Sequence, residues 1–135
     1  MPPAAPLPKN EIKRLKVLWQ YDVLDTVPEE IFDDLTDLAA HICEAPVALI
    51  SLVDENRQWF KSRVGISLQE TSRDISFCAH ALLTDDLLVV PDATKDPRFR
   101  DNPMVTGRHP AVCRKSHHGA RIVDVERTGY LSARQ

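Results

Sequence analysis

Residues 47–53 constrain the fold of this chain more than any other segment, because they are apolar at nearly every position. A strand wetted on one side alternates apolar and polar side chains, whereas a continuous apolar run indicates a strand covered on both faces. Turn residues follow at 54–56, and segment 58–64 then alternates, with Phe60 and Trp59 on opposite faces. The two segments predict an antiparallel hairpin with a layer of structure on each side.

Two amphipathic helices are predicted before this hairpin. The first begins after Asn10, where apolar residues recur at helical spacing among charged ones. The second is predicted over residues 27–44, because Thr26 and Glu29 have the spacing of a capping box and Pro46 stops the helix. The residues expected on the core-facing side of this second helix are Phe32, Leu35, Leu38, Ala39 and Ile42.

A short helix and a second buried strand are predicted after the hairpin. Ser76 is placed to cap a helix over residues 77–83, and residues 87–90 form an apolar run that Pro91 ends. Helices mixed with antiparallel strands indicate an α+β domain.

The last quarter of the chain differs in composition from the rest. Residues 1–107 contain 11 Lys and Arg against 18 Asp and Glu, a net charge of −7, whereas residues 108–135 contain 6 against 2, a net of +4. Only residues 122–125 have a strand-like pattern in the basic part. We therefore divide the chain into a disordered, Pro- and Ala-rich segment 1–9, a folded domain 10–107 and an atypical basic tail 108–135.

Charge and cysteine usage exclude several classes of protein. The overall net charge of −3 gives no indication of nucleic-acid binding, and the longest apolar run is too short to span a bilayer. Three scattered cysteines without a disulfide framework, and no secretory signal, indicate a cytoplasmic protein. We expect neither a nucleic-acid nor a membrane partner.

Four segments, taken in order, resemble the GAF domain found at the N-terminus of many bacterial sensor histidine kinases and diguanylate cyclases. They are YDVLDTVPEEIFDDLTDLAAHI, VALISLVDENRQWFKSRVG, DISFCAHALL and LVVPDATKDPRFRDNPMVTG. The resemblance covers residues 11–107, and the ordered set of motifs makes it specific. It implies a GAF-like antiparallel sheet of five or six strands, with helices packed on one face and a small-ligand cavity on the other.

After residue 107 the resemblance ends. Family members continue with an apolar strand, a Gly-containing hairpin and a closing helix, whereas residues 108–135 are biased toward Arg, His, Pro and Gly. This composition favours a truncation or a shifted reading frame after about residue 107, and a diverged but genuine terminus is the alternative. We expect a fold that is incomplete at its C-terminal end, with a poorly packed tail holding at most one short strand.

Five residues are candidates for ligand contacts in the implied cavity: Phe60, Ser76, Cys78, His80 and Asp92. Cys78 and His80 stand two apart on a helix, so they do not share a face and cannot form a thiolate–imidazole pair. A buried thiol and a histidine hydrogen-bonded at the cavity edge are the structural alternative. Asp92 flanks the cavity mouth, where a solvated loop charge is the alternative role.

Catalytic chemistry has no support in the pattern, so we expect no enzyme. A zinc site drawn from Cys78, His80, His109, Cys113, His117 and His118 matches no compact ligand spacing, and no metal site is predicted. The methionine sulfoxide reductases of the family depend on several cysteines around the cavity, and only Cys78 lies in a matching region. The Asn-Lys…Phe…Asp-Glu signature of cyclic-nucleotide-binding GAF domains is absent.

Three functions are compared. The first is a regulatory module that senses an unidentified small molecule in bacterial signal transduction, including two-component systems, and the sequence indicates no particular cofactor. The second is a homodimer or interaction module that associates through its N-terminal helix and binds no ligand. The third is an enzyme of the methionine sulfoxide type. We expect the first, with a homodimer formed through the N-terminal helix.

Overall fold

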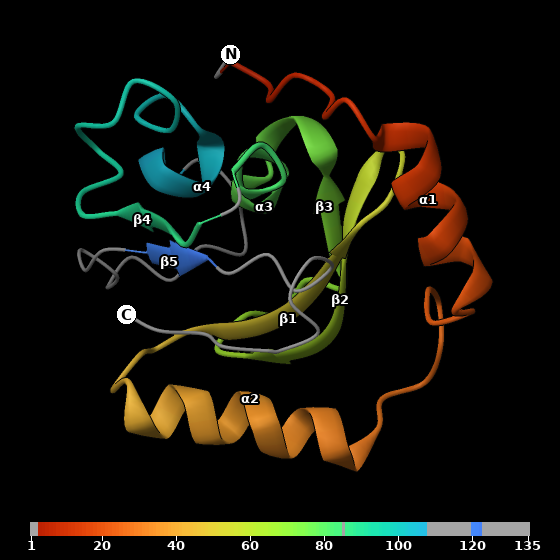
Figure 1. Cartoon of the computed structure of the whole chain (residues 1–135). Coiled ribbons are helices and arrows are strands. Elements are labelled where there is room, and N and C mark those ends of the chain that lie inside the picture. The colour runs from red at the N-terminus through yellow and green to blue at the C-terminus, as the bar shows by residue number, and fades with distance from the viewer. Residues whose placement is uncertain (1–2, 85, 108–119, 123–135) are drawn as a thin grey trace.

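The computed structural model describes residues 3–84, 86–107 and 120–122 (Figure 1). Its elements are α1 (Glu11–Gln20), α2 (Glu30–Ile42), β1 (Ala48–Val53), β2 (Arg57–Val64), β3 (Glu70–Ser72), the 3-10 turn η1 (Arg73–Ile75), α3 (Phe77–Ala81), β4 (Leu88–Val90), α4 (Pro103–Thr106) and β5 (Ala120–Ile122). One antiparallel sheet has the order β1-β2-β3, and β4 and β5 form a separate antiparallel pair. The predicted α+β fold is confirmed.

The sheet β1-β2-β3 lies between α2 on one face and α3 on the other, and α1 stands at its side (Figure 1). Ala48 and Val53 at the ends of β1 are buried, but the four residues between them are only half-buried. Full coverage of this run was expected on both faces. The difference follows from the length of α3, which has five residues and covers only part of the strand.

A bulge in β2 changes which side chains reach α2. Ile50 pairs with Ser62, whereas the next residue, Ser51, pairs with Phe60, so Lys61 is the extra residue. The Lys61 side chain is 1% exposed, forms an ion pair with Glu29 and donates hydrogen bonds at the N-terminal side of α2. The strict alternation predicted for this strand is therefore wrong beyond Phe60.

The start of α2 also differs from the prediction. The helix begins at Glu30 after an extended Glu29, and the Thr26 hydroxyl donates to the carbonyl of Val23 and accepts from Lys61. The capping box is therefore wrong. Its physical obstacle is Pro28, because the residue before a proline is driven out of the helical region.

The outward side of α2 carries most of the apolar residues that were expected to face the core. The residue of α2 with the deepest burial is Thr36, at 2% exposed, whose hydroxyl lies against Ser62 of β2. Leu35, Leu38 and Ile42 are exposed, so their predicted packing is wrong. The bulge gives the reason: Lys61 and Ser62 bring polar groups to α2, and the polar side of the helix meets them.

Apart from the packing of α2 on the sheet, there is a hydrophobic core between α3, β4 and the loop before α4, which we name the second core. Phe99 and Val90 are fully buried in it, together with Ala81 and Leu88. The Phe77 and Phe99 rings stack with centroids 4.2 Å apart. This core attaches the short α3 to the rest of the domain.

The C-terminal part contains the one short strand that was anticipated, at a shifted position. β5 covers Ala120–Ile122, rather than residues 122–125, and pairs with β4. The other residues of the predicted basic tail lie outside the described part of the chain. Within the described residues the expected sheet of five or six strands is divided into two smaller ones, and no helix there is long and apolar enough to cross a membrane.

Candidate functional site

A buried polar cluster joins the sheet to α3 on the face away from α2. The Gln58 amide nitrogen of β2 donates to the Ser51 hydroxyl at 2.9 Å and to the Cys78 sulfur at 3.0 Å. Its amide oxygen accepts from the Ser76 hydroxyl at 2.5 Å, and the Ser51 oxygen lies 3.3 Å from the Cys78 sulfur. Gln58 and Ser76 are 5% and 4% exposed. We name Ser51, Gln58, Ser76 and Cys78 the polar cluster.

Local sequence places these four side chains together. Ser51 and Gln58 lie on the same sheet face, because Gln58 pairs with Val53, which stands two residues from Ser51 along β1. Ser76 caps α3 by accepting from the backbone nitrogen of Ala79 at 3.1 Å, as its position predicted. The cap fixes the first turn of α3, and this brings Cys78 over the sheet.

His80 faces a different environment from Cys78, in agreement with their spacing on the helix. Its ring meets the edge of Phe99 with centroids 4.9 Å apart, and the Pro3 carbonyl accepts a hydrogen bond from it. Burial and the neighbouring positive charge of Arg98 lower the pKa of His80. His80 thus packs against Phe99 of the second core.

The other two predicted site residues lie in different places. Phe60 pairs with Ser51 and is 3% exposed, which puts it on the same sheet face as the polar cluster. Asp92 follows β4 and accepts hydrogen bonds from the backbone nitrogen and the hydroxyl of Thr94. Asp92 therefore stabilises a turn after β4.

An ion triad connects the segment beside the polar cluster to α1. Arg73, the first residue of η1, binds the Glu11 carboxylate at 2.5 Å, and Arg14 binds the same carboxylate at 3.0 Å. Arg14 also donates to the Val53 carbonyl at 2.6 Å. Arg73 stands three residues before Ser76, so the triad links the polar cluster to the N-terminal helix through one short stretch of backbone.

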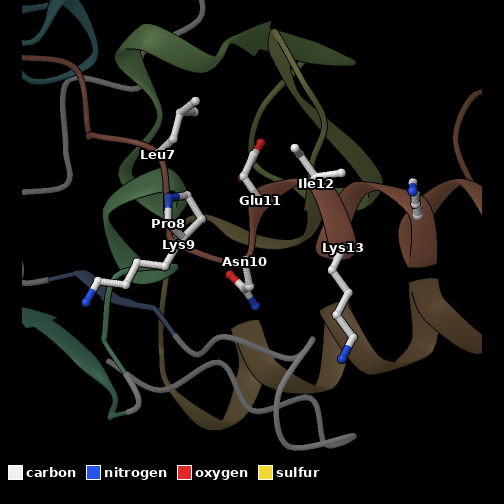
Figure 2. A pocket seen from close by; sticks show the side chains of 8 residues that line it. Leu7, Pro8, Lys9, Asn10, Glu11, Ile12 and Lys13 are labelled. Carbon is white, nitrogen blue, oxygen red and sulfur yellow. The ribbon is translucent and has the colours of Figure 1, made fainter.

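Two hollows open on the surface, neither lined by a member of the polar cluster, and Phe60 is among the residues that line the second. One, of about 590 Å³, lies at the start of α1 and is lined by residues 7–13 and Lys16 (Figure 2). The other, of about 340 Å³, lies between α2 and the β2–β3 edge, where Asp33, Lys61 and Arg63 contribute to its wall. Between the sheet and α3, where the small-ligand cavity is predicted, the members of the polar cluster hydrogen-bond one another.

Sequence reasoning missed Ser51 and Gln58. The sequence did contain a pattern that could have indicated them. Ser51 is the single polar residue in the run 47–53, and Gln58 is a polar residue two positions before Phe60.

Four of the six residues weighed as a zinc site lie outside the described part of the chain. Within that part no group of three His, Cys, Asp or Glu side chains is placed to hold a metal ion.

Comparison with known proteins identifies the family. The model of the GAF domain matches residues 27–124. The chain belongs to the GAF domain family. Over 102 residues it is 41% identical to a cyclic di-GMP phosphodiesterase of Pseudomonas aeruginosa, and the match covers 76% of this chain. The chain spans 17% of the length of that relative.

The GAF match extends beyond the boundary at residue 107 and includes β5. It begins after α1, so the N-terminal helix lies outside the matched residues. Both GAF membership and the relative's name support a regulatory domain in a signalling protein. The division at residues 9 and 107 stays a prediction, as does the role of each candidate site residue in binding a ligand.

Proposed function

We propose that this GAF domain senses a small molecule at the polar cluster and has no catalytic activity of its own. The observation that carries the proposal is the buried contact between Gln58 and α3, made by amide, hydroxyl and thiol groups in place of an apolar core. A ligand with hydrogen-bonding groups can replace these contacts one for one, so that few buried polar atoms of the protein lose a hydrogen-bond partner when it binds.

The proposed response uses the ion triad. A ligand that enters between the sheet and segment 65–83 displaces α3, and Arg73 transmits this displacement to Glu11 and thus to α1. The similarity to a cyclic di-GMP phosphodiesterase supports an output domain that turns over a cyclic dinucleotide. A histidine kinase of a two-component system is the other output we propose, in the cytoplasm in either case.

Thermal unfolding with and without small molecules tests the sensing proposal. At 100 times its dissociation constant a ligand stabilises the domain by about 2.7 kcal/mol, which raises the Tm by about 10 °C or more. The probes are cyclic di-GMP and a panel of soluble metabolites. We expect Gln58→Leu to abolish the shift given by the active probe, and Gln20→Leu, an exposed glutamine on α1, to retain it. A full shift in the Gln58 variant would place the ligand elsewhere.

Replacing Cys78 tests the absence of catalysis. We expect the parent protein to show no thiol-dependent reduction of free methionine sulfoxide above background. Cys78→Ala should lower the free energy of unfolding by about 1 kcal/mol, since it removes a half-buried thiol. Turnover by the parent that disappears in Cys78→Ala and remains in Cys43→Ala would establish an enzyme instead.

A further inference from the structure

Both acidic and basic side chains line the hollow of about 340 Å³ between α2 and the β2–β3 edge, which we name the α2 hollow. Asp33 and Asp37 contribute to its wall from α2, and Arg63 contributes from β2. Its volume lies within the range of about 300–1,000 Å³ that is usual for small-molecule sites. Because no member of the polar cluster lines it, a ligand bound here is distinct from one bound at the polar cluster.

The two carboxylates of the α2 hollow lie one helical turn apart. Asp33 and Asp37 are separated by four positions on α2, a spacing that places both side chains on one side of a helix. One oxygen of Asp33 accepts a hydrogen bond from the Ser62 hydroxyl at 2.6 Å. Neither carboxylate forms an ion pair within the described residues. This wall therefore presents two negative charges to a ligand.

Lys61 also lies in the wall of the α2 hollow, but its charge is already matched. Its side chain is 1% exposed and forms an ion pair with Glu29 at 2.6 Å. The ammonium group also donates to the Thr26 hydroxyl at 2.7 Å and to the Val27 carbonyl at 2.8 Å. A lysine ammonium has three N–H donors, and these three acceptors use all of them. Lys61 therefore holds the segment between α1 and α2 against β2 and has no donor for a ligand.

Arg63 is the basic group of the wall that can bind a ligand. It is exposed, and it donates a hydrogen bond to the Gln69 side-chain oxygen at 2.7 Å. In the part of the chain that the structure describes, Arg63 forms no ion pair. Gln69 is itself fixed to β2, because its side-chain nitrogen donates to the Phe60 carbonyl at 2.6 Å. A guanidinium has five N–H donors in a planar fork that suits a carboxylate, so Arg63 has donors for an anionic group.

The charges of the wall select the charges of the ligand. Two carboxylates and one guanidinium remain after Lys61 is matched by Glu29, and their net charge is −1. An amine without a carboxylate leaves Arg63 unmatched, and an anion without amines is repelled by Asp33 and Asp37. A ligand with two cationic groups and one carboxylate matches all three. We propose that the α2 hollow binds a basic α-amino acid, with its two cationic groups on the aspartates and its carboxylate on Arg63.

Isothermal titration calorimetry of the full chain with L-lysine tests this proposal. Low ionic strength is used, because salt screens exposed charges. Three analogues each lack one of the three charges: cadaverine has no carboxylate, norleucine has no side-chain amine, and Nα-acetyl-lysine has no α-ammonium group. Each should bind about tenfold more weakly than lysine or worse, since each loses a charge-assisted hydrogen bond. Nα-acetyl-lysine also represents the C-terminal lysine of a peptide, so it distinguishes the free amino acid from that source.

Two variants change exposed side chains of the wall, and their thermal unfolding curves report on the fold. Asp37→Asn should raise the dissociation constant of lysine about tenfold or more. Arg63→Gln should have an effect of similar size on lysine. It should not weaken the binding of cadaverine, because cadaverine has no carboxylate for Arg63 to bind. This difference between the two ligands assigns the carboxylate to Arg63.

Two further variants are controls. Asp34→Asn removes an exposed carboxylate of α2 that does not line the α2 hollow, and it should leave the dissociation constant of lysine unchanged. Gln58→Leu alters the polar cluster and should also bind lysine as the parent does. The second control separates this site from the sensing site, so either proposal can fail while the other holds.

Three results would overturn the proposal. They are a parent chain that gives no heat of binding with lysine, analogues that bind as tightly as lysine, and variants of Asp37 and Arg63 that bind lysine as the parent does. Loss of lysine binding in Gln58→Leu with full binding in Asp37→Asn would place the amino acid at the polar cluster instead.

Discussion

Phe99→Ala is expected to lower the free energy of unfolding by about 3–5 kcal/mol, the usual cost of removing a fully buried aromatic side chain. Phe99 is 0% exposed, stacks on Phe77 and meets the edge of His80, so its removal leaves a cavity between α3 and β4. Urea denaturation followed by circular dichroism measures the effect.

Phe99→Leu is the matched control, because it keeps most of the buried volume and should cost less than half as much. A loss below 1 kcal/mol for Phe99→Ala would mean that the second core does not hold α3 in place. The proposed sensing mechanism would then lack its support, since α3 would be attached to the sheet by the polar cluster alone.

Glu11→Gln is expected to cost about 3 kcal/mol at neutral pH. The substitution preserves the shape of the side chain but leaves two guanidinium groups, Arg14 and Arg73, without the carboxylate between them. Breaking a buried ion pair by removing one partner costs far more than the pair contributes, because the remaining charge stays buried. The control is Glu55→Gln, which changes an exposed glutamate in the turn between β1 and β2. This substitution should alter the free energy of unfolding by less than about 0.5 kcal/mol.

The difference in unfolding free energy between the parent and Glu11→Gln should depend on pH, and this provides a second measurement. Burial raises the pKa of Glu11, but the hydrogen bonds and charges of Arg73 and Arg14 outweigh it and hold the pKa below its ordinary value of 4.5. Stabilisation by the carboxylate is therefore complete above about pH 4.5 and is lost as the pH falls through the lower folded pKa. We expect parent and Glu11→Gln to converge in stability under acid, and parallel curves from pH 7 to pH 3 would contradict the triad.

The sequence predicted the elements that local signals determine. The apolar run at residues 47–53 became β1, the alternating segment became β2, and Ser76 caps α3, since each depends on residues close together in the chain. The bulge at Lys61 could not be predicted, because an alternating strand and a bulged one have the same pattern until the partner strand sets the register.

The candidate site was predicted in part for the same reason. Ser76 and Cys78 lie in the polar cluster, but Gln58 was missed because its role depends on a helix that follows it by 20 residues. Charged residues on α1 resembled a solvated face, whereas Glu11 and Arg14 are buried against Arg73, at a distance along the chain that no periodicity reveals. Long-range pairing of charges is the information that single-sequence patterns lack.

The ion triad also fixes the order of events during synthesis. Glu11 and Arg73 are separated by 62 positions. Because a ribosome adds about 5–20 residues per second, Arg73 is synthesised roughly 3–12 s after Glu11. Leu15 and Leu18, which are buried in the finished domain, have no sheet strand beside them until residues 48–64 have been made. The contact that holds the N-terminal helix beside η1 therefore cannot form before residue 73 has been made, although the helix itself is among the first residues of the chain.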